Sequence, residues 1–225
     1  MDENNLSLLF ARSFPFWNHM TAEDQETFLR SSYRVRFDKG VNIHDGNQCT
    51  GIILIKTGSL RLYLLSADGK EITLGRLFPG EICVLSASCA LQSVTVDIFI
   101  DSEENSECVV VGGCAYEEIA GRIPEVKIFT YEAALSRFSE IMWVMQQILF
   151  MSMDKRLAIF LLDEAAKNGT DTIKLTHEQI AKYMGSAREV VSRMLKYFAA
   201  EGLIISSRSE GIRLLDRKKL RALAL

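Results

Sequence analysis

A long apolar rhythm in the middle of the chain constrains its fold more than any other feature. From Pro124 to about Phe150 the residues follow a helical pattern, and a second apolar stripe accompanies the first at Ile141, Val144 and Ile148. The main stripe has the 3-and-4 spacing of a coiled-coil seam. We predict that one side of this helix packs on the chain's own core and the other on a second copy, with a helix buried wholly within one chain as the alternative. The seam residues are Ile128, Tyr131, Leu135, Phe138, Met142, Met145 and Leu149.

Before this helix, from Tyr33 to about Val111, the pattern is that of β-strands. Short segments rich in β-branched residues alternate with glycine or polar turns, of which Ala67-Asp68-Gly69-Lys70 is the clearest. Evenly spaced short strands of this kind predict an antiparallel sandwich or barrel. A short helical lead precedes them, with Thr21 as a helix N-cap. We expect the strands in YRVRF, GIILIKTG, LRLYLL, EITLGRL, VTVDIFID and CVVVGG.

The residues after the long helix predict a smaller, mainly helical domain. Asp154 begins a helix that ends at Asn168-Gly169, and a short strand, DTIKL, follows. Thr176 and Gln179 have the spacing of a capping box, and Gly185 permits a sharp turn into the next helix. The segments LIIS and GIRLLD then form a hairpin. This order predicts a winged helix-turn-helix, whose second helix suits the major groove of DNA.

Charge is distributed unevenly along the chain. The net charge is −3, but residues 151–225 hold 14 Lys and Arg against 9 Asp and Glu, a net +5, whereas residues 1–150 hold 12 against 20, a net −8. A basic C-terminal third predicts a polyanionic partner for that third alone. The start of the chain, MDENNLSLLFARSF, lacks the order of a signal peptide, and no apolar run has the length of a membrane span, which favours a cytoplasmic protein.

The second helix of the predicted motif has a polar face suited to reading bases. Arginine donates two hydrogen bonds to guanine and a carboxylate accepts one from cytosine, while serine and lysine hold phosphates. A merely solvated face is the alternative. The face spans roughly 140° at about 100° per residue and comprises Arg188, Glu189, Ser192, Arg193 and Lys196.

Four residues at the starts of the two helices have roles that the pattern leaves open: Ser186, Glu189, Thr176 and His177. If Ser186 is the N-cap, Glu189 is the third helical residue and completes a second capping box, so that it does two jobs. Thr176 and His177 are expected to cap and brace the first helix, within reach of phosphate.

These segments resemble the Crp–Fnr family of bacterial transcription regulators over nearly the whole chain. LTHEQIAKYMGSAREVVSRMLKYFAAEGLI resembles the helix-turn-helix, GIILIKTGSLRLYLLSADGKEITLGRLFPGE the β-roll core, and RFSEIMWVMQQILF part of the dimer helix. The resemblance implies an α+β fold: an antiparallel, cyclic-nucleotide-binding-like β-roll (a double-stranded β-helix) in 1–123, a dimerisation helix in 124–150, and a winged helix-turn-helix in 151–225.

The resemblance also implies partners and base readers. It implies a homodimer on double-stranded DNA, a near-palindromic operator with half-sites similar to TGTGA or TTGAT, and RNA polymerase as a candidate partner. The family's base-reading positions correspond to Arg188, Glu189 and Arg193, and Ser192 matches the form found in the oxygen-sensing branch.

The sequence does not identify the effector. The cyclic-nucleotide branch follows its Gly-Glu with an arginine that grips phosphate, but here no Lys or Arg occurs between Arg76 and Arg122. Because a buried phosphate without a cation is costly, we do not expect cyclic AMP. No cysteine precedes Cys49, so the N-terminal iron–sulfur cluster of the oxygen-sensing branch is not expected either.

The candidate effector pocket contains two cysteines whose role stays open. They would sense redox change or bind haem iron or another metal, or, as we favour, fill the roll as small apolar side chains. His19 and His44 are alternative haem ligands, although an isolated histidine usually packs or lies on the surface; Trp17 and Trp143 are expected to be core or interface anchors. The pocket residues are Gly80, Glu81, Ile82, Cys83 and Cys89.

Five scattered cysteines, without a CxxC pair or zinc spacing, predict neither a disulfide framework nor a metal site. The competing class is a cupin-like metal-binding or small-molecule-binding protein with an accessory helical domain, and a third is a plain protein-interaction module. The three histidines, at 19, 44 and 177, do not supply a metal triad, and no nucleophile–base pair stands out, so we expect no enzyme.

Overall fold

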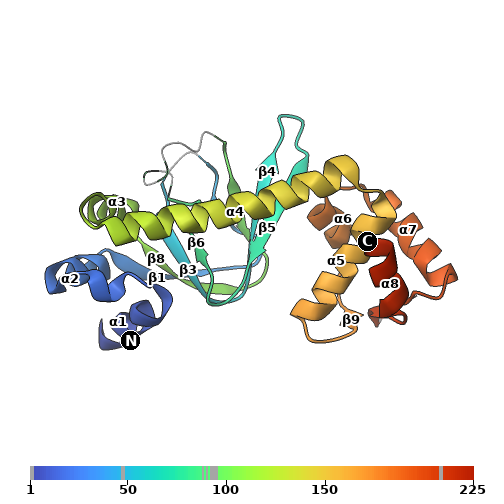
Figure 1. Cartoon of the computed structure of the whole chain (residues 1–225), viewed down its shortest axis with the longest axis horizontal. Helices are drawn as coiled ribbons and strands as arrows, with labels where there is room; N and C mark the ends of the chain where they lie inside the picture. Colours follow the sequence, from blue (N-terminus) through green and yellow to red (C-terminus); the bar gives the residue numbers. More distant parts are fainter. Residues whose placement is uncertain (1–2, 47–48, 88, 90, 92–95, 208–209) are drawn as a thin grey trace. The chain divides into compact units, whose positions relative to one another are not determined.

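The computed structural model describes residues 3–46, 49–87, 89, 91, 96–207 and 210–225 of the chain (Figure 1). It separates into two compact units. The first comprises the chain up to Leu65 together with Leu74–Ile141, and the second comprises Ser66–Thr73 together with Met142–Leu225. The division falls inside the long central helix.

The first unit is built on two four-stranded antiparallel sheets. One sheet has the order β1 (Ser32–Phe37), β8 (Ser106–Val111), β3 (Ile52–Thr57) and β6 (Ile82–Cys83). The other has the order β2 (Asn42–His44), β7 (Phe99–Ser102), β4 (Leu60–Leu65) and β5 (Glu71–Leu77). The β-branched and leucine side chains of β3, β4 and β8 are buried in the core, as their alternation with turns predicts, and the β-roll is confirmed.

Two strands escaped the sequence prediction because they are very short. β2 has three residues and β6 has two, too few to show an alternating pattern. The expected VTVDIFID strand begins only at Phe99, and its first residues lie outside the described ones.

Four short helices enclose an aromatic core beside the sheets. They are α1 (Glu3–Ser13), the 3-10 helix η1 (Trp17–His19), α2 (Ala22–Arg30) and α3 (Gly113–Arg122). Thr21 caps α2 as predicted, accepting a hydrogen bond from the Asp24 amide. The ring centroids lie 5.2–6.1 Å apart, so this corner is closely packed. Its rings belong to Phe10, Phe14, Phe16, Trp17, Phe28 and Tyr116.

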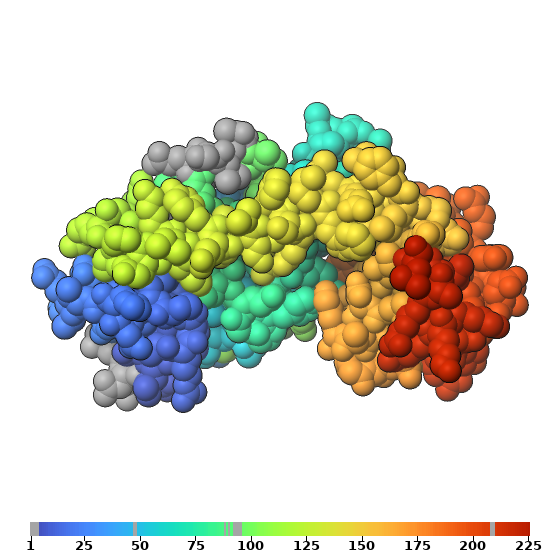
Figure 2. Space-filling view, viewed as in Figure 1, coloured from blue at the N-terminus to red at the C-terminus, as the bar shows by residue number. Residues whose placement is uncertain are grey.

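The long helix α4 (Pro124–Phe150) has the predicted bounds. Its inner side buries Val126 and Thr130, and Phe129 packs against the aromatic core. Its outer side is uncovered along the surface in Figure 2. All the predicted seam residues lie there and are 45–65% exposed: Ile128, Tyr131, Leu135, Phe138, Met142, Met145 and Leu149.

The second unit contains the predicted winged helix-turn-helix. Its helices are α5 (Met153–Lys167), α6 (His177–Met184), α7 (Arg188–Ala200) and α8 (Arg217–Ala224). A three-stranded antiparallel sheet has the order β10 (Ile204–Ser207), β11 (Gly211–Leu214) and β9 (Thr172–Ile173). Helix α8 was not predicted from the sequence, although Asp216 caps it by accepting a hydrogen bond from the Lys219 amide and Leu220 is buried in the core.

Two turn glycines with similar backbone angles differ in how closely neighbouring residues approach them. Gly58 and Gly69 have φ of +83° and +80°, where other residues are strained by about 1–2 kcal/mol. A Cβ at Gly58 would also overlap Ser106, whose Cα would lie 2.7 Å away, whereas a Cβ at Gly69 would meet nothing within 4 Å.

We therefore predict that Gly58→Ala lowers the free energy of unfolding by about 2–5 kcal/mol, since overpacking adds to the strain, and that Gly69→Ala lowers it by about 1–2 kcal/mol. Urea unfolding of the two variants measures the difference. Equal losses would contradict the close approach of the Gly58 turn to β8.

Candidate nucleic-acid interface

The turn between α6 and α7 is held by backbone geometry. Gly185 adopts φ +57°, a left-handed conformation that glycine tolerates best, and the Ser186 amide donates to the Ala181 carbonyl at 2.9 Å. Arg156 of α5 also donates to the Met184 carbonyl. At the other end of α6 the predicted capping box is present: Thr176 and Gln179 each accept a hydrogen bond from the other's backbone amide, at 3.1 and 2.8 Å.

The packing of α7 determines which of its residues face solvent. Val191, Leu195 and Phe198 are at most 1% exposed and lie in the core of the second unit. The charged residues therefore project outward. Arg188, Glu189, Arg193 and Lys196 are exposed, and Ser192 is half-buried.

One expectation about the start of α7 is wrong. The N-cap is Ala187, without a side-chain hydrogen bond, so Glu189 is the second helical residue and does not complete a capping box. Ser186 contacts the Met153 sulfur instead, at 3.8 Å. The helix starts one residue later than expected because Ala187 takes the extended conformation of a cap, φ −84° and ψ 144°. Glu189 is consequently free for another partner.

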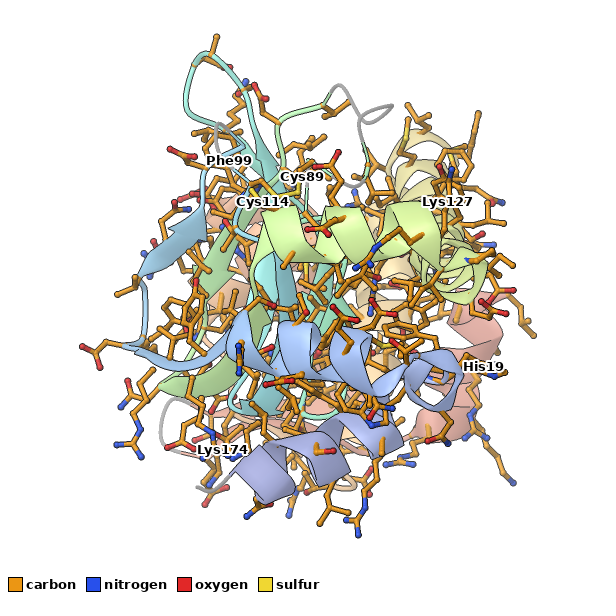
Figure 3. All side chains as sticks on the ribbon, turned by 90° about the vertical axis from the view of Figure 1, so that its left-hand side faces the viewer. His19, Cys89, Phe99, Cys114, Lys127 and Lys174 are labelled. Carbon is orange, nitrogen blue, oxygen red and sulfur yellow. A yellow bond between two sulfur atoms is a disulfide. The ribbon has the colours of Figure 1, made fainter. Side chains whose placement is uncertain are left out.

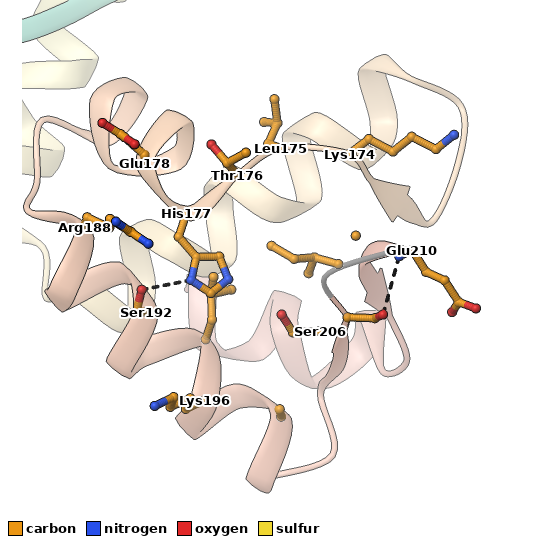
Figure 4. Close-up of a pocket in the computed structure, with 15 residues that line it drawn as sticks. Lys174, Leu175, Thr176, His177, Glu178, Arg188, Ser192, Lys196, Ser206 and Glu210 are labelled. Carbon is orange, nitrogen blue, oxygen red and sulfur yellow. Dashed lines mark hydrogen bonds between the residues drawn. The ribbon is translucent and has the colours of Figure 1, made fainter.

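A groove of about 860 Å³ lies between the N-terminus of α6, the outer side of α7 and the β10–β11 hairpin (Figure 4). Among the predicted DNA-binding residues it is lined by Thr176, His177, Arg188, Ser192 and Lys196. Glu189, Arg193 and Ser186 are not in its lining, and the first two are exposed on the same helix.

The groove also contains residues that the sequence analysis did not single out. Lys174 lies just before α6, and Ser206, Ser207 and Glu210 belong to the hairpin. Only the predicted hairpin pointed to them, because a strand pattern does not show which side chains turn toward a neighbouring helix.

His177 connects α6 to α7. Its Nδ1 lies 2.8 Å from the Ser192 hydroxyl oxygen, and Figure 4 shows its ring beside Ser192, joined to it by a dashed line. Partial burial, followed by the nearby positive charges of Arg188 and Lys196, lowers the pKa of His177 below its usual 6.5. The imidazole is therefore neutral at pH 7 and positions Ser192 in the groove.

The predicted effector residues are only partly brought together. Glu81 accepts from the Phe78 amide at 2.8 Å and lies 3.5 Å from the guanidinium of Arg137 on α4. Arg137 also pairs with Glu140 at 2.6 Å. A cavity lined by Arg137 and Glu140 has a volume of about 10 Å³, no more than a water needs, and none of the predicted effector residues lines it. A cation thus does reach Glu81, from outside the β-roll segment searched in the sequence.

The remaining predicted effector residues do not form one pocket. Ile82 and Cys83 form β6, and Gly80 precedes it with φ +91°. Burial raises the pKa of the Cys83 thiol, which lies inside the roll as an apolar filler. Cys89 is not its partner: it is disulfide-bonded to Cys49.

The sequence predicted no disulfide framework, but the structure pairs Cys49 with Cys89 and leaves Cys83, Cys108 and Cys114 as free thiols. The two paired cysteines are 40 residues apart with a Cα–Cα distance of 5.7 Å, a contact that sequence spacing does not reveal.

The two histidines and Trp17 fit the simpler expectation: His44 is buried with its Nδ1 2.8 Å from the Thr50 hydroxyl, His19 is exposed and Trp17 is in the core. Trp143 lies on α4 and is 45% exposed, so it is not a core residue, and its role as an interface anchor stays a prediction.

Within the described residues, no group of three or more His, Cys, Asp or Glu side chains is placed to hold a metal ion. No helix in the described part of the chain is long and apolar enough to cross a membrane.

Comparison with known proteins agrees with this geometry. Residues 155–223 match the Crp-like helix-turn-helix domain. A crystal structure described as a transcriptional regulator of the Crp/Fnr family, from Eubacterium rectale, is 41% identical with a TM-score of 0.88, and the match covers 95% of this chain and 99% of that one. The chain belongs to the Crp–Fnr family of transcription regulators.

Two further relatives of this Crp–Fnr protein are more distant. The transcriptional regulatory protein Btr of Bordetella pertussis is 25% identical over 198 residues, covering 84% of this chain and 80% of that protein. The nitrogen fixation regulation protein FixK of Azorhizobium caulinodans is 28% identical over 193 residues, covering 80% and 73%. The protein is a DNA-binding transcription regulator of the Crp–Fnr type, a family of regulators rather than enzymes, and the cupin-like alternative is not favoured.

The His177 environment predicts a measurable titration. In NMR spectra the imidazole should titrate with a midpoint below 6.5, and Arg188→Ala should move the midpoint upward by removing a nearby positive charge. Since only the folded state disfavours protonation, His177 should also reduce the free energy of unfolding as the pH falls below 6.5. His177→Gln should remove that part of the pH dependence; a midpoint at or above 6.5 would contradict the placement of His177.

Proposed function

We propose that this regulator is a homodimer that binds a near-palindromic operator through two copies of α7, under the control of a signal received by the β-roll. The observation that carries the proposal is the exposed charged side of α7, set on a winged helix-turn-helix whose apolar side is buried. Arg188, Glu189 and Arg193 read base edges, because arginine suits guanine and a carboxylate suits cytosine. Glu189 has no capping duty that would compete with this role.

The groove residues hold the sugar–phosphate backbone in this proposal. Lys196 and the Ser192 hydroxyl meet phosphates, and neutral His177 keeps Ser192 in place. Thr176 lines the same groove at the start of α6, whereas Ser186, just before α7, lies outside the groove lining. Such contacts fix the register of the protein on DNA and make binding strongly dependent on salt.

The second copy of the chain covers the seam of α4. Seven large apolar side chains 45–65% exposed along one helix form a far larger apolar surface than scattered exposed residues do. Their heptad spacing suits the same helix of a partner, and pairing places two α7 helices for successive major grooves. In this proposal a shift of the paired α4 helices, caused by the signal at the β-roll, controls whether the two α7 helices can bind DNA.

The remaining assignments follow from this arrangement. We place the protein in the cytoplasm, where it reaches DNA, with RNA polymerase as a candidate partner and without catalytic activity. The 1–123, 124–150 and 151–225 segments act as sensor, dimer helix and DNA-binding domain. Arg137 is ion-paired with Glu81 and Glu140. The phosphate of cyclic AMP would need a cation that is not already paired in this way, which supports a different effector.

Base readers and phosphate holders should respond differently to alanine. Arg188→Ala should weaken binding to the preferred duplex by about 1–3 kcal/mol, with little effect on unrelated DNA. Lys196→Ala should weaken both and reduce the slope of log affinity against log salt by about 1. Titration of fluorescent duplexes at several salt concentrations measures both effects. Arg12→Ala, at an exposed arginine of α1, is the control; the same affinity in Arg188→Ala as in wild type would remove α7 as the reader.

A charge within the seam should separate the protomers. Leu135→Asp would bury an unpaired carboxylate between two helices, at a cost of several kcal/mol, so sedimentation equilibrium should show monomers and operator binding should fall with it. Ser136→Asp adds the same charge to an exposed residue on the flank of α4 and should leave the dimer intact. A wild-type dimer in Leu135→Asp would show that the seam is not the interface.

A further inference from the structure

The disulfide of the first unit lies against the start of a helix. A Cβ at Gly113, the first residue of α3, would overlap the Cys49 sulfur and lie 2.7 Å from the Cys89 sulfur. Figure 3 shows Cys89 and Cys114 labelled at that end of α3. The sulfur pair therefore fills the space that a side chain at position 113 would otherwise take, and only glycine fits there.

The surroundings of this pair favour reaction, in contrast to those of the other cysteines in the roll. Cys49 and Cys89 are half-buried, and the cap of α3 is Gly112, which has no side chain to satisfy the amides of the first turn. Helix N-terminal amides favour a thiolate nearby. Cys83 and Cys108, by contrast, are buried, and burial raises the pKa of both thiols, that of Cys108 to about 11.

α3 is firmly joined to α4. The Tyr116 hydroxyl lies 2.7 Å from that of Thr130 on α4, both side chains are buried, and only Ile123 separates the two helices. Arg122, the last residue of α3, pairs with Asp24 at 2.9 Å. The Tyr116–Thr130 contact therefore connects α3 physically to the base of α4.

We infer that Cys49 and Cys89 form a reversible oxidation site that reacts with peroxides and sets the DNA affinity of the regulator through α3 and α4. This inference rests on the proposed function and names its signal. The Cys49 thiolate attacks the peroxide, the O–O bond breaks, and a sulfenic acid and an alcohol or water form. The Cys89 thiol then attacks that sulfur, the S–O bond breaks and water leaves. Overall, two thiols and one peroxide give one disulfide, one alcohol or water, and one further water, with two electrons passing from sulfur to oxygen.

The first test counts thiols in the full-length protein. After hydrogen peroxide, denaturation and alkylation, mass spectrometry should find three alkylated cysteines and a peptide linking Cys49 to Cys89, and dithiothreitol should restore five. Cys114→Ser, which removes an exposed free thiol on α3, should still form the link, and Cys49→Ser should not. Five alkylated thiols after peroxide, or a link from Cys89 to another cysteine, would overturn the inference.

The second test uses two glycines of α3. The protein is equilibrated with mixtures of reduced and oxidised glutathione, and the midpoint, the mixture at which half of the disulfide has formed, is measured. Gly113→Ala should need at least a fivefold more oxidising mixture than wild type, because the added methyl group overlaps the sulfur pair. Gly121→Ala, whose Cβ would meet nothing within 4 Å, should leave the midpoint unchanged. An unchanged midpoint in a folded Gly113→Ala protein would overturn the claimed packing, and the thiol count decides the matter if that variant does not fold.

The third test separates this inference from the proposed function. Oxidised and reduced wild type should differ at least tenfold in affinity for a duplex that the protein selects from random DNA, and Cys89→Ser should bind alike before and after peroxide. Equal affinities would overturn the switch while leaving operator binding intact. Failure of both forms to select any duplex would instead overturn the proposed function.

Discussion

The burial of one side of α7 is the interaction on which the rest of this structure depends. Val191, Leu195 and Phe198 are each worth about 1.5–3 kcal/mol when removed from water, whereas a pair of charges on a helix surface contributes about 0.2–0.5 kcal/mol. The apolar side therefore decides the rotation of the helix, and Arg188 and Arg193 face outward as a consequence. Substitution of these outward-facing arginines should therefore disturb the fold little, because exposed charges contribute little to stability.

The helix α4 must also bury apolar side chains, and it carries them on two sides. Its inner side buries Val126 and Thr130 and joins α3 through Tyr116, while its outer side carries a continuous apolar seam. One helix thus connects the aromatic corner of the β-roll to a surface suited to a second chain. The buried contact between the Tyr116 and Thr130 hydroxyls joins α3 to the base of this same helix, and it is the connection on which the proposed redox switch relies.

Much of this could be predicted from the sequence where the signal is periodic. The bounds of α4, the Thr176 capping box and the Gly185 turn follow from repeating apolar spacing and from backbone preferences that act over a few residues. The Cys49–Cys89 bond and the approach of Arg137 to Glu81 could not be foreseen, because they join segments 40 and 56 residues apart and depend on how the roll closes. Serine is preferred over alanine as an N-cap, so the sequence favours Ser186 as the cap of α7. The geometry of the preceding turn overrides that preference and makes Ala187 the cap.

The central claim is that two copies of one charged helix read DNA from a symmetric dimer. Selection of bound duplexes from a random pool by the purified protein, followed by sequencing, tests it most directly. The account predicts an enriched inverted repeat whose half-sites are centred about one helical turn, roughly 34–36 Å, apart. Enrichment of a single unrepeated site, or of no sequence at all, would contradict it.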